Sequence, residues 1–190
     1  MERNPENLIE WALKEAEVLL SPLGSRWKHV QGVAQRAYSI GDMFTEEDRA
    51  YLIASAYLHD IGYATVLQKT GLHPIDGACY LKSHHQDRLA SLVAYHSGAQ
   101  FEARLRGLTK EIKQFPYEYS LISDALTFCD MTTNSIGNQV SFQERIGDIF
   151  SRYDETHVVF QAINQATPSL GIAVANIQQK LNELKEFHLS

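Results

Sequence analysis

Four ionisable residues of this sequence occupy positions where a helix should be apolar, and together they could bind a metal ion. They are His29, His59, Asp60 and Asp130. The apolar residues that share their helical stripes are Val33, Ala37 and Ile40, then Leu52, Ile53 and Ala56, and then Ile122 and Leu126. Because a buried and unpaired carboxylate is costly, Asp130 should have a strong partner.

A single inward residue of this kind has an ordinary explanation. One histidine is more often a hydrogen-bonded core residue than a ligand, and one aspartate can be satisfied by a buried arginine or a helix cap. Two histidines and two carboxylates from three separate helices are better explained by a shared ligand. Imidazole and carboxylate together suit Mn, Fe, Co, Ni or Zn, and they suit Mg less well. The sequence therefore predicts a divalent metal site with one or two ions.

His73 and His96 are the candidates for binding a second ion. His73 precedes Pro74, which disfavours helical geometry at His73 and favours a helix that starts there. A core hydrogen bond for His96 and an N-terminal cap for His73 are the ordinary alternatives. If both bind metal, Asp60 is expected to bridge the two ions. The stripe that His96 continues consists of Leu89, Leu92 and Val93.

The segments that must hold these residues have helical patterning. Apolar residues recur at steps of three and four without clear β alternation, so we expect an all-α fold. The stretch 97–115 is polar and should contain a loop that passes over the core. Pro116 should open the next helix. The expected helices cover about 8–19, 25–43, 45–62, 73–83, 86–96, 116–132, 142–150 and 157–187.

Composition limits the classes of protein and partner. The chain has 190 residues, of which 44% are hydrophobic and 21% charged, as is usual for one soluble domain. It has no apolar run near the roughly 20 residues that span a bilayer and no secretory signal pattern, so we expect a cytoplasmic protein without a membrane partner. The net charge of −6 and the scattered Lys and Arg residues argue against extended nucleic acid. A small phosphorylated substrate fits this charge, because bound cations add positive charge.

The order His29, then His59-Asp60, then Asp130 resembles the H…HD…D pattern of HDIG-type HD-domain phosphohydrolases. His73 and His96 resemble the additional histidines of binuclear HD proteins, including those that hydrolyse diadenosine polyphosphates. The segments that carry the resemblance are RWKHVQGVAQRA at 26–37, AYLHDIGYA at 56–64, LHPIDGA at 72–78 and ALTFCDMTT at 125–133.

This resemblance implies an HD-domain helical bundle in which residues 1–190 form a single domain. The metal-site core would cover about 26–133. An N-terminal helix at 5–20 and C-terminal helices at 138–187 would pack on that core.

The activity that the resemblance implies is metal-dependent hydrolysis of a phosphate ester or anhydride, with a nucleotide or another small phosphorylated metabolite as substrate. Asp60 is expected to bind metal and to orient the attacking water or accept its proton. Arg26 and Lys28 are candidate phosphate contacts, although cations in a first helical turn are commonly just exposed. Two departures suggest different phosphate handling. Tyr63 stands where many relatives have Lys, and the Glu that nucleoside-monophosphate-cleaving relatives place near this point is absent.

Two other functions stay open at this point. Some HD-fold proteins use a similar set of His and Asp residues as di-iron oxygenases, for which bound iron and dioxygen consumption would be diagnostic. A catalytically silent nucleotide-sensing module would bind a nucleotide without turnover. The sequence does not fix the oligomeric state, and a homodimer is compatible with it.

Overall fold

The computed structural model describes the backbone of residues 4–189 and the side chains as far as residue 186, and this part of the chain contains helices and no strand. The prediction of an all-α fold is therefore confirmed. The α-helices are α1 (Pro5–Leu20), α2 (Ser25–Ile40), α3 (Glu46–Leu58), α4 (His73–Ser83), α5 (Asp87–Tyr95), α6 (Ala99–Leu105), α7 (Thr109–Ile112), α8 (Leu121–Met131), α9 (Phe142–Arg152) and α10 (Val158–Leu189).

Side-chain caps define where several of these helices begin. The Asn4 side chain accepts a hydrogen bond from the first turn of α1, and Thr45 does the same for α3, whose first turn also carries three acidic residues. These acidic side chains stabilise the positive end of the helix dipole. Ser120 and Ser141 form capping boxes at the starts of α8 and α9. These caps therefore fix the residues at which α8 and α9 begin.

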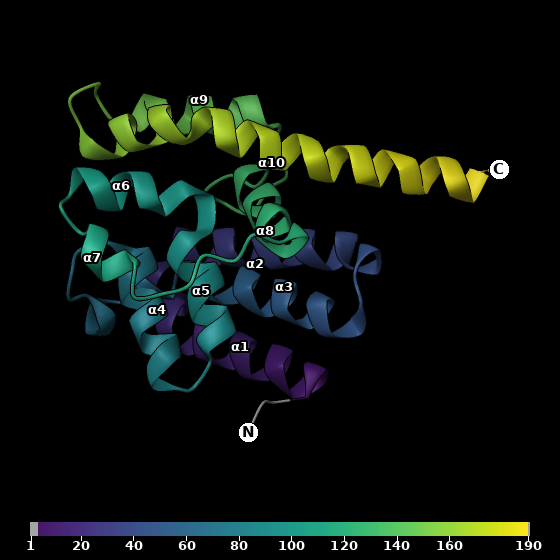
Figure 1. Cartoon of the computed structure of the whole chain (residues 1–190), viewed down its shortest axis with the longest axis horizontal. Coiled ribbons are helices and arrows are strands. Elements are labelled where there is room, and N and C mark those ends of the chain that lie inside the picture. Colours follow the sequence, from purple (N-terminus) through teal and green to yellow (C-terminus); the bar gives the residue numbers. More distant parts are fainter. Residues whose placement is uncertain (1–3, 190) are drawn as a thin grey trace.

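The helices pack around α3, which lies inside the bundle (Figure 1). One apolar cluster joins α1 and α3 to α4 and α5. A second cluster joins α2 and α3 to α8, and a third joins α8 to α9 and α10. Because α3 is shared by the first two clusters, the residues at its C-terminal end are surrounded by helices on several sides.

Helix α10 differs from the other helices in its length and its partial packing. Its N-terminal half packs on α6, α8 and α9, whereas its C-terminal end extends beyond the rest of the molecule (Figure 1). Among the α10 side chains that the structure describes, Ile177 is the last fully buried one, and almost every residue from 178 to 186 is exposed. The part of α10 as far as Ile177 therefore helps to form the interior.

The structure corrects two expectations about residues 97–132. The stretch 97–115, expected to contain a loop over the core, is largely helical: Ala99 and Ala103 of α6 are buried in the first apolar cluster, and Phe101 packs on the third, which contains α10 residues. The expectation that Pro116 opens a helix is wrong, since α8 begins at Leu121 after the Ser120 cap. Glu118 lies in the intervening non-helical segment, where its carboxylate binds Arg88 of α5.

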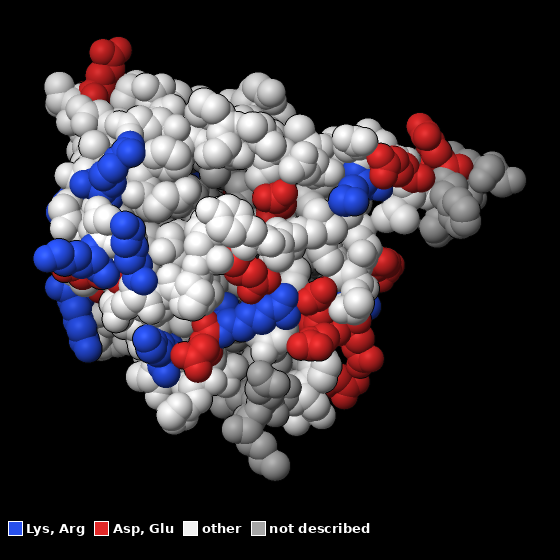
Figure 2. Space-filling model, in the orientation of Figure 1, with Lys and Arg blue, Asp and Glu red and all other residues white. Residues whose placement is uncertain are grey.

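The charged side chains are divided unevenly over the face shown in Figure 2. Lys and Arg gather mainly at the end of the molecule where Figure 1 shows α6 and α7, and the acidic side chains gather mostly away from that end. None of the helices within the described residues combines the length and the hydropathy needed to cross a membrane.

Candidate metal centre

Six side chains from five helical segments converge at the C-terminal end of α3. His29 comes from α2 and Asp130 from α8, while His59 and Asp60 follow the last residue of α3. His73 is the first residue of α4, and His96 follows the last residue of α5. All except His73 are at most 6% exposed. The chain thus brings together every residue that the sequence predicted as a metal ligand.

The six residues form two adjacent groups of potential ligands. In the first, one side-chain nitrogen or oxygen from each of His29, His59 and Asp130 lies within 4.8 Å of the others. Asp60, His73 and His96 form the second group by the same measure. Each group contains two imidazoles and one carboxylate, which is a donor set that first-row transition metals favour.

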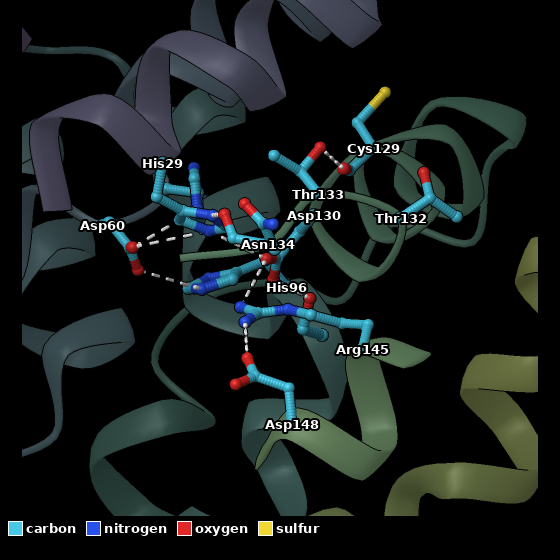
Figure 3. Close-up of polar contacts among 12 residues, drawn as sticks. His29, Asp60, His96, Cys129, Asp130, Thr132, Thr133, Asn134, Arg145 and Asp148 are labelled. Atoms are coloured by element: carbon cyan, nitrogen blue, oxygen red, sulfur yellow. Dashed lines mark hydrogen bonds and ion pairs between the residues drawn. The ribbon is translucent and has the colours of Figure 1, made fainter. Parts of the chain in front are cut away.

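Asp60 lies between the two groups. Its Oδ2 atom is 3.4 Å from His59 Nε2 and 4.0 Å from His29 Nε2, whereas its Oδ1 atom is 3.2 Å from His73 Nε2. The two oxygens of one carboxylate therefore face different groups. Figure 3 shows Asp60 with its dashed contacts toward the histidines.

Backbone carbonyls orient three of the imidazole rings. His29 Nδ1 lies 2.9 Å from the Asn134 carbonyl, and His59 Nδ1 lies 2.8 Å from the carbonyl of Ala56. His96 Nδ1 lies 2.6 Å from the carbonyl of Val93. A carbonyl only accepts hydrogen bonds, so each Nδ1 carries the proton and donates it. Each Nε2 then presents a lone pair to the centre, as in metal-binding histidines.

This arrangement fits a cation. His29 Nε2 lies 3.1 Å from Asp130 Oδ1, so a nitrogen lone pair and a carboxylate oxygen, both acceptors, face each other. His59 Nε2 is buried and makes no hydrogen bond with any described residue. A positive ion between these atoms would remove the repulsion between acceptors and satisfy the His59 lone pair, so the residues present fit a divalent metal.

The protonation states also fit metal binding. Burial lowers the pKa of His59, His73 and His96 below the ordinary histidine value, which favours neutral rings. Burial alone would raise the pKa of Asp60, but His59, Arg26 and His73 outweigh it and hold that pKa well below its usual value. The pKa of Asp130 is lowered against the effect of burial as well, chiefly by the neighbouring His29 ring, with contributions from His59 and Arg145. Neutral imidazoles and ionised carboxylates are the forms that bind divalent ions.

Two close backbone approaches fix the positions of these ligands. A Cβ atom on Gly32 of α2 would overlap the backbone of Gly137, which has a φ of +88° that favours glycine. The contact holds the loop after α8 against α2, where the Asn134 carbonyl reaches His29. A Cβ atom on Gly62 would overlap the carbonyl of His73, so the glycine permits α4 to begin beside Asp60.

The two predicted phosphate contacts differ in their surroundings. Arg26 donates to Asp60 Oδ2 at 2.7 Å, and its guanidinium lies 4.0 Å above the centre of the Tyr63 ring. Arg26 also lines the cavity together with several of the potential ligands, so it is more than an exposed first-turn cation. Lys28 is exposed and is absent from the cavity lining. The structure therefore brings only Arg26 to the centre.

Asp130 has the strong partners that the sequence required, and two of them were missed. Besides the contact with His29, it accepts a 2.5 Å hydrogen bond from Ser97. It also lies 3.6 Å from the Arg145 guanidinium, as Figure 3 shows. Ser97, in the short segment after His96, has a positive φ of 47°, and its hydroxyl reaches Asp130 from this backbone conformation. Arg145 lies three residues after Phe142 and four before Ile149, and this inward helical spacing could have identified it.

We call the six potential ligands the floor; all of them except His59 line a cavity of about 450 Å³. Tyr63, Leu72 and Glu102 line parts of its sides, and α9 and the start of α10 contribute the remaining wall. In Figure 3, Arg145 extends from α9 toward Asp130, with Asp148 on the other side of the guanidinium. The cavity is large enough for a small organic molecule above the ligands.

Comparisons with known proteins give one match. A family model described as the HD domain matches residues 26–124, which is just over half of the chain. The matched region includes every potential ligand except Asp130, which follows it by six residues. Neither the curated proteins nor the solved structures provide a match.

Proposed function

The chain belongs to the HD-domain family, whose members are generally metal-dependent phosphohydrolases, and from this premise we propose that it hydrolyses a phosphate ester or anhydride of a small molecule. The observation that carries the proposal is the pair of adjacent His-His-Asp groups on the floor of one cavity. Two ions held side by side suit phosphoryl transfer, because they can act on both the attacking and the leaving oxygen.

The six residues divide naturally between two ions. His29, His59 and Asp130 would hold one ion, and His73 and His96 would hold the other. Asp60 would bridge them, because its two oxygens face opposite groups. Mn, Fe, Co, Ni and Zn suit this donor set better than Mg.

The bound ions would lower the pKa of a water molecule toward neutrality and polarise a phosphoryl oxygen. Asp60 is the residue that we assign to orienting the attacking water or accepting its proton, since its carboxylate lies between the groups. Arg26 is placed to donate hydrogen bonds to a phosphoryl oxygen, because its guanidinium already reaches the same carboxylate. Burial of the floor residues excludes bulk water and strengthens each of these interactions.

The substrate that we propose is a nucleotide or another small phosphorylated metabolite. A cavity of about 450 Å³ suits a molecule of this size, and the chain's net charge of −6 disfavours extended nucleic acid. We also propose that residues 1–190 act as one domain. Residues of α1, such as Leu8 and Ala12, share an apolar cluster with α3, and Ile177 of α10 joins the cluster that contains α2 and α8.

Elemental analysis of the purified full chain, paired with a phosphate-release screen under anaerobic conditions, tests the proposal. The screen would cover nucleotides, dinucleoside polyphosphates and sugar phosphates with each candidate metal. We expect at least one divalent ion per chain and metal-dependent phosphate release. Asp60→Asn should abolish release, whereas Asp42→Asn, at a fully exposed position, should not.

Three outcomes would contradict the proposal. Phosphate release that persists after verified metal removal would exclude metal-assisted hydrolysis. Bound iron with dioxygen consumption and no anaerobic release would favour an oxygenase. Tight nucleotide binding without turnover in any metal would favour a sensing module.

A further inference from the structure

Helix α9 presents one face to the cavity, and that face changes character along its length. Its lining residues are Arg145, Ile149 and Arg152, at steps of four and three. At about 1.5 Å per residue, this face extends roughly 10 Å from Arg145, which is farther than a phosphoryl group reaches. The wall therefore has room for the organic part of a substrate as well as its phosphate.

Arg145 lies at the deep end of this face, next to the metal ligands. The residue is 7% exposed, and its guanidinium lies 3.6 Å from Asp130 and 3.3 Å from Asp148. Its Nε atom is buried and makes no hydrogen bond with any described residue. A guanidinium has five N–H donors in a planar fork that matches the oxygens of phosphate. Arg145 thus has a buried donor that makes no hydrogen bond with any described residue, and its guanidinium lies beside Asp130 at the cavity.

Arg26 and Arg145 approach the floor from different helices and contact different carboxylates. Arg26 of α2 donates to Asp60, whereas Arg145 of α9 contacts Asp130. The two carboxylates belong to different ligand groups. An anion seated above both groups would therefore receive hydrogen bonds from two arginines, one at each group.

The wall beyond Arg145 is mostly apolar and aromatic, with Arg152 as its one cation among the described residues. Ile149 of α9 is joined there by residues at helical spacing on α10 and by Tyr153, whose ring stacks on His157. Such a surface binds an aliphatic or aromatic group in preference to a sugar hydroxyl. The residues that α10 contributes are Val159, Ala162 and Ile163.

We infer that Arg145 is a substrate-binding residue, and that the cavity face of α9 and α10 selects phosphorylated molecules whose organic group is apolar or aromatic. This inference rests on the proposed function, since it deepens the substrate class of that site. The selecting wall lies wholly after residue 124, where the family match ends. Substrate selection is thereby assigned to a part of the chain that the family match does not cover.

Isothermal titration of the metal-loaded full chain with three non-hydrolysable probes tests the inference. The probes are inorganic phosphate, methylphosphonate and phenylphosphonate, of which the last two differ only in their organic group. We expect phenylphosphonate to bind at least about tenfold more tightly than methylphosphonate, because the ring buries several more carbon atoms. Val159→Thr, which is nearly the same shape, should reduce this preference by roughly threefold or more.

Arg145→Ala should weaken the binding of all three probes by about 10–100-fold, as expected for a lost hydrogen bond to a charged group. Arg145→Lys keeps the charge and should have an intermediate affinity, and it serves as the second variant if the alanine variant does not fold. Arg104→Ala removes an exposed guanidinium from α6 and should bind like the wild type. Titration of each variant with Mn²⁺ measures the metal affinity separately.

Unchanged phosphate affinity in both Arg145 variants would overturn the role of Arg145, and so would a loss of Mn²⁺ affinity without a loss of phosphate affinity. Equal binding of the two phosphonates would overturn the role of the wall. The proposed function fails separately. If the probes bind as expected but no phosphate ester or anhydride is turned over, hydrolysis is wrong and the assignment of the binding residues stands.

Discussion

The floor and the wall of the cavity are built on different principles. On the floor, backbone carbonyls orient the His29, His59 and His96 rings, and neighbouring charges keep the carboxylates of Asp60 and Asp130 ionised. The wall that α9 and α10 contribute is mainly apolar and aromatic, with the buried cation Arg145 at its deep end and the exposed Arg152 farther out. Metal binding at the floor thus requires particular nitrogen and oxygen atoms at fixed positions. Substrate binding at the wall requires only a surface of suitable shape and polarity.

Because of this difference, we expect the floor to carry metal binding and catalysis and the wall to determine which substrate binds. A floor ligand cannot be exchanged without leaving a polar partner unsatisfied, whereas apolar wall residues can be exchanged for others of similar volume. Five of the six floor residues lie within the matched region 26–124, and all of the α9 and α10 wall lies outside it. We therefore expect substitutions on the floor to affect metal binding and turnover together, and substitutions on the wall to affect mainly substrate affinity.

The largest effect is expected for His59→Ala. His59 is 1% exposed, and its Nε2 faces both carboxylates, so its loss opens the first group of ligands. We expect metal affinity and phosphate release to fall by more than the roughly 10–100-fold that is typical for the loss of an outer-shell partner. Elemental analysis and the phosphate-release assay measure both quantities. The matched control is His84→Ala, at an exposed histidine, which should retain metal and activity.

Full metal content and normal turnover in His59→Ala would show that His59 is not a metal ligand. If circular dichroism reports that the variant is unfolded, Asp130→Asn offers a second test with nearly unchanged side-chain volume. The floor assignment then requires that Asp130→Asn loses metal while it keeps its helical content.

Metal removal should lower the stability of the whole chain. An ion that binds only the folded state adds about 2.7 kcal/mol when its concentration is 100 times its Kd. For a chain of 190 residues this corresponds to an increase in Tm of roughly 5–11 °C. Calorimetry with Mn²⁺ and with excess chelator measures the difference, which should vanish in His59→Ala. A Tm that does not respond to metal in the wild type would show that the floor does not bind it.

The floor residues could be predicted from the sequence because they are polar residues at positions where the helical pattern calls for apolar ones. His29 and Asp130 interrupt apolar helical stripes, and a polar residue at such a position is costly unless it has a partner. The helices that hold them were predicted for the same reason, since their burial produces regular spacing. The division of the ligands into two groups with Asp60 between them was expected mainly from the resemblance to binuclear HD proteins, because helical spacing alone does not say how α3, α4 and α5 meet in space.

The wall was not predicted, although part of its pattern was present. Arg145 lies on the apolar stripe of α9, but a long arginine side chain at such a position usually extends along the helix to reach water. The non-helical segment before α8 was missed because Pro116 also fits the first turn of a helix. The capping box that fixes the start of α8 is a local contact between Ser120 and Ser123. Because serine is also common in loops, this pair did not stand out in the sequence.

An intermediate effect is expected for Gly32→Ala, which tests how the floor is supported. The added Cβ would overlap the backbone of Gly137 and displace the loop that carries the Asn134 carbonyl. We expect the free energy of unfolding to fall by about 1–3 kcal/mol, with a loss of metal affinity of about tenfold or more. Urea denaturation and metal titration measure these changes.

Gly147→Ala is the matched control for this substitution. Gly147 lies in α9, and apart from its chain neighbours and the nearby backbone of its own helix no described atom lies within 4 Å of its ideal Cβ position. Alanine should therefore stabilise the helix by about 0.4–1 kcal/mol and leave metal affinity unchanged. Equal stability changes in the two variants would show that the contact between α2 and the 134–139 loop does not support the floor.

The smallest effect is expected away from both regions, at the ion pair between Glu118 and Arg88. Burial alone would raise the pKa of Glu118, but hydrogen bonds from Arg88 and Ser120 hold it below the ordinary glutamate value. A carboxyl with a depressed pKa binds fewer protons in the folded state, so its contribution to stability is present above the unfolded pKa. That contribution disappears as the pH falls through the lower folded pKa.

Because the pair is partly exposed, we expect Glu118→Gln to cost less than about 1 kcal/mol at pH 7. Urea denaturation at pH 7 and at several values below 4.5 measures the difference between the variant and the wild type, which should shrink as the pH falls. A difference that grows with acidity would show that Glu118 is not held ionised by Arg88, and metal affinity should be unchanged at pH 7 in either case.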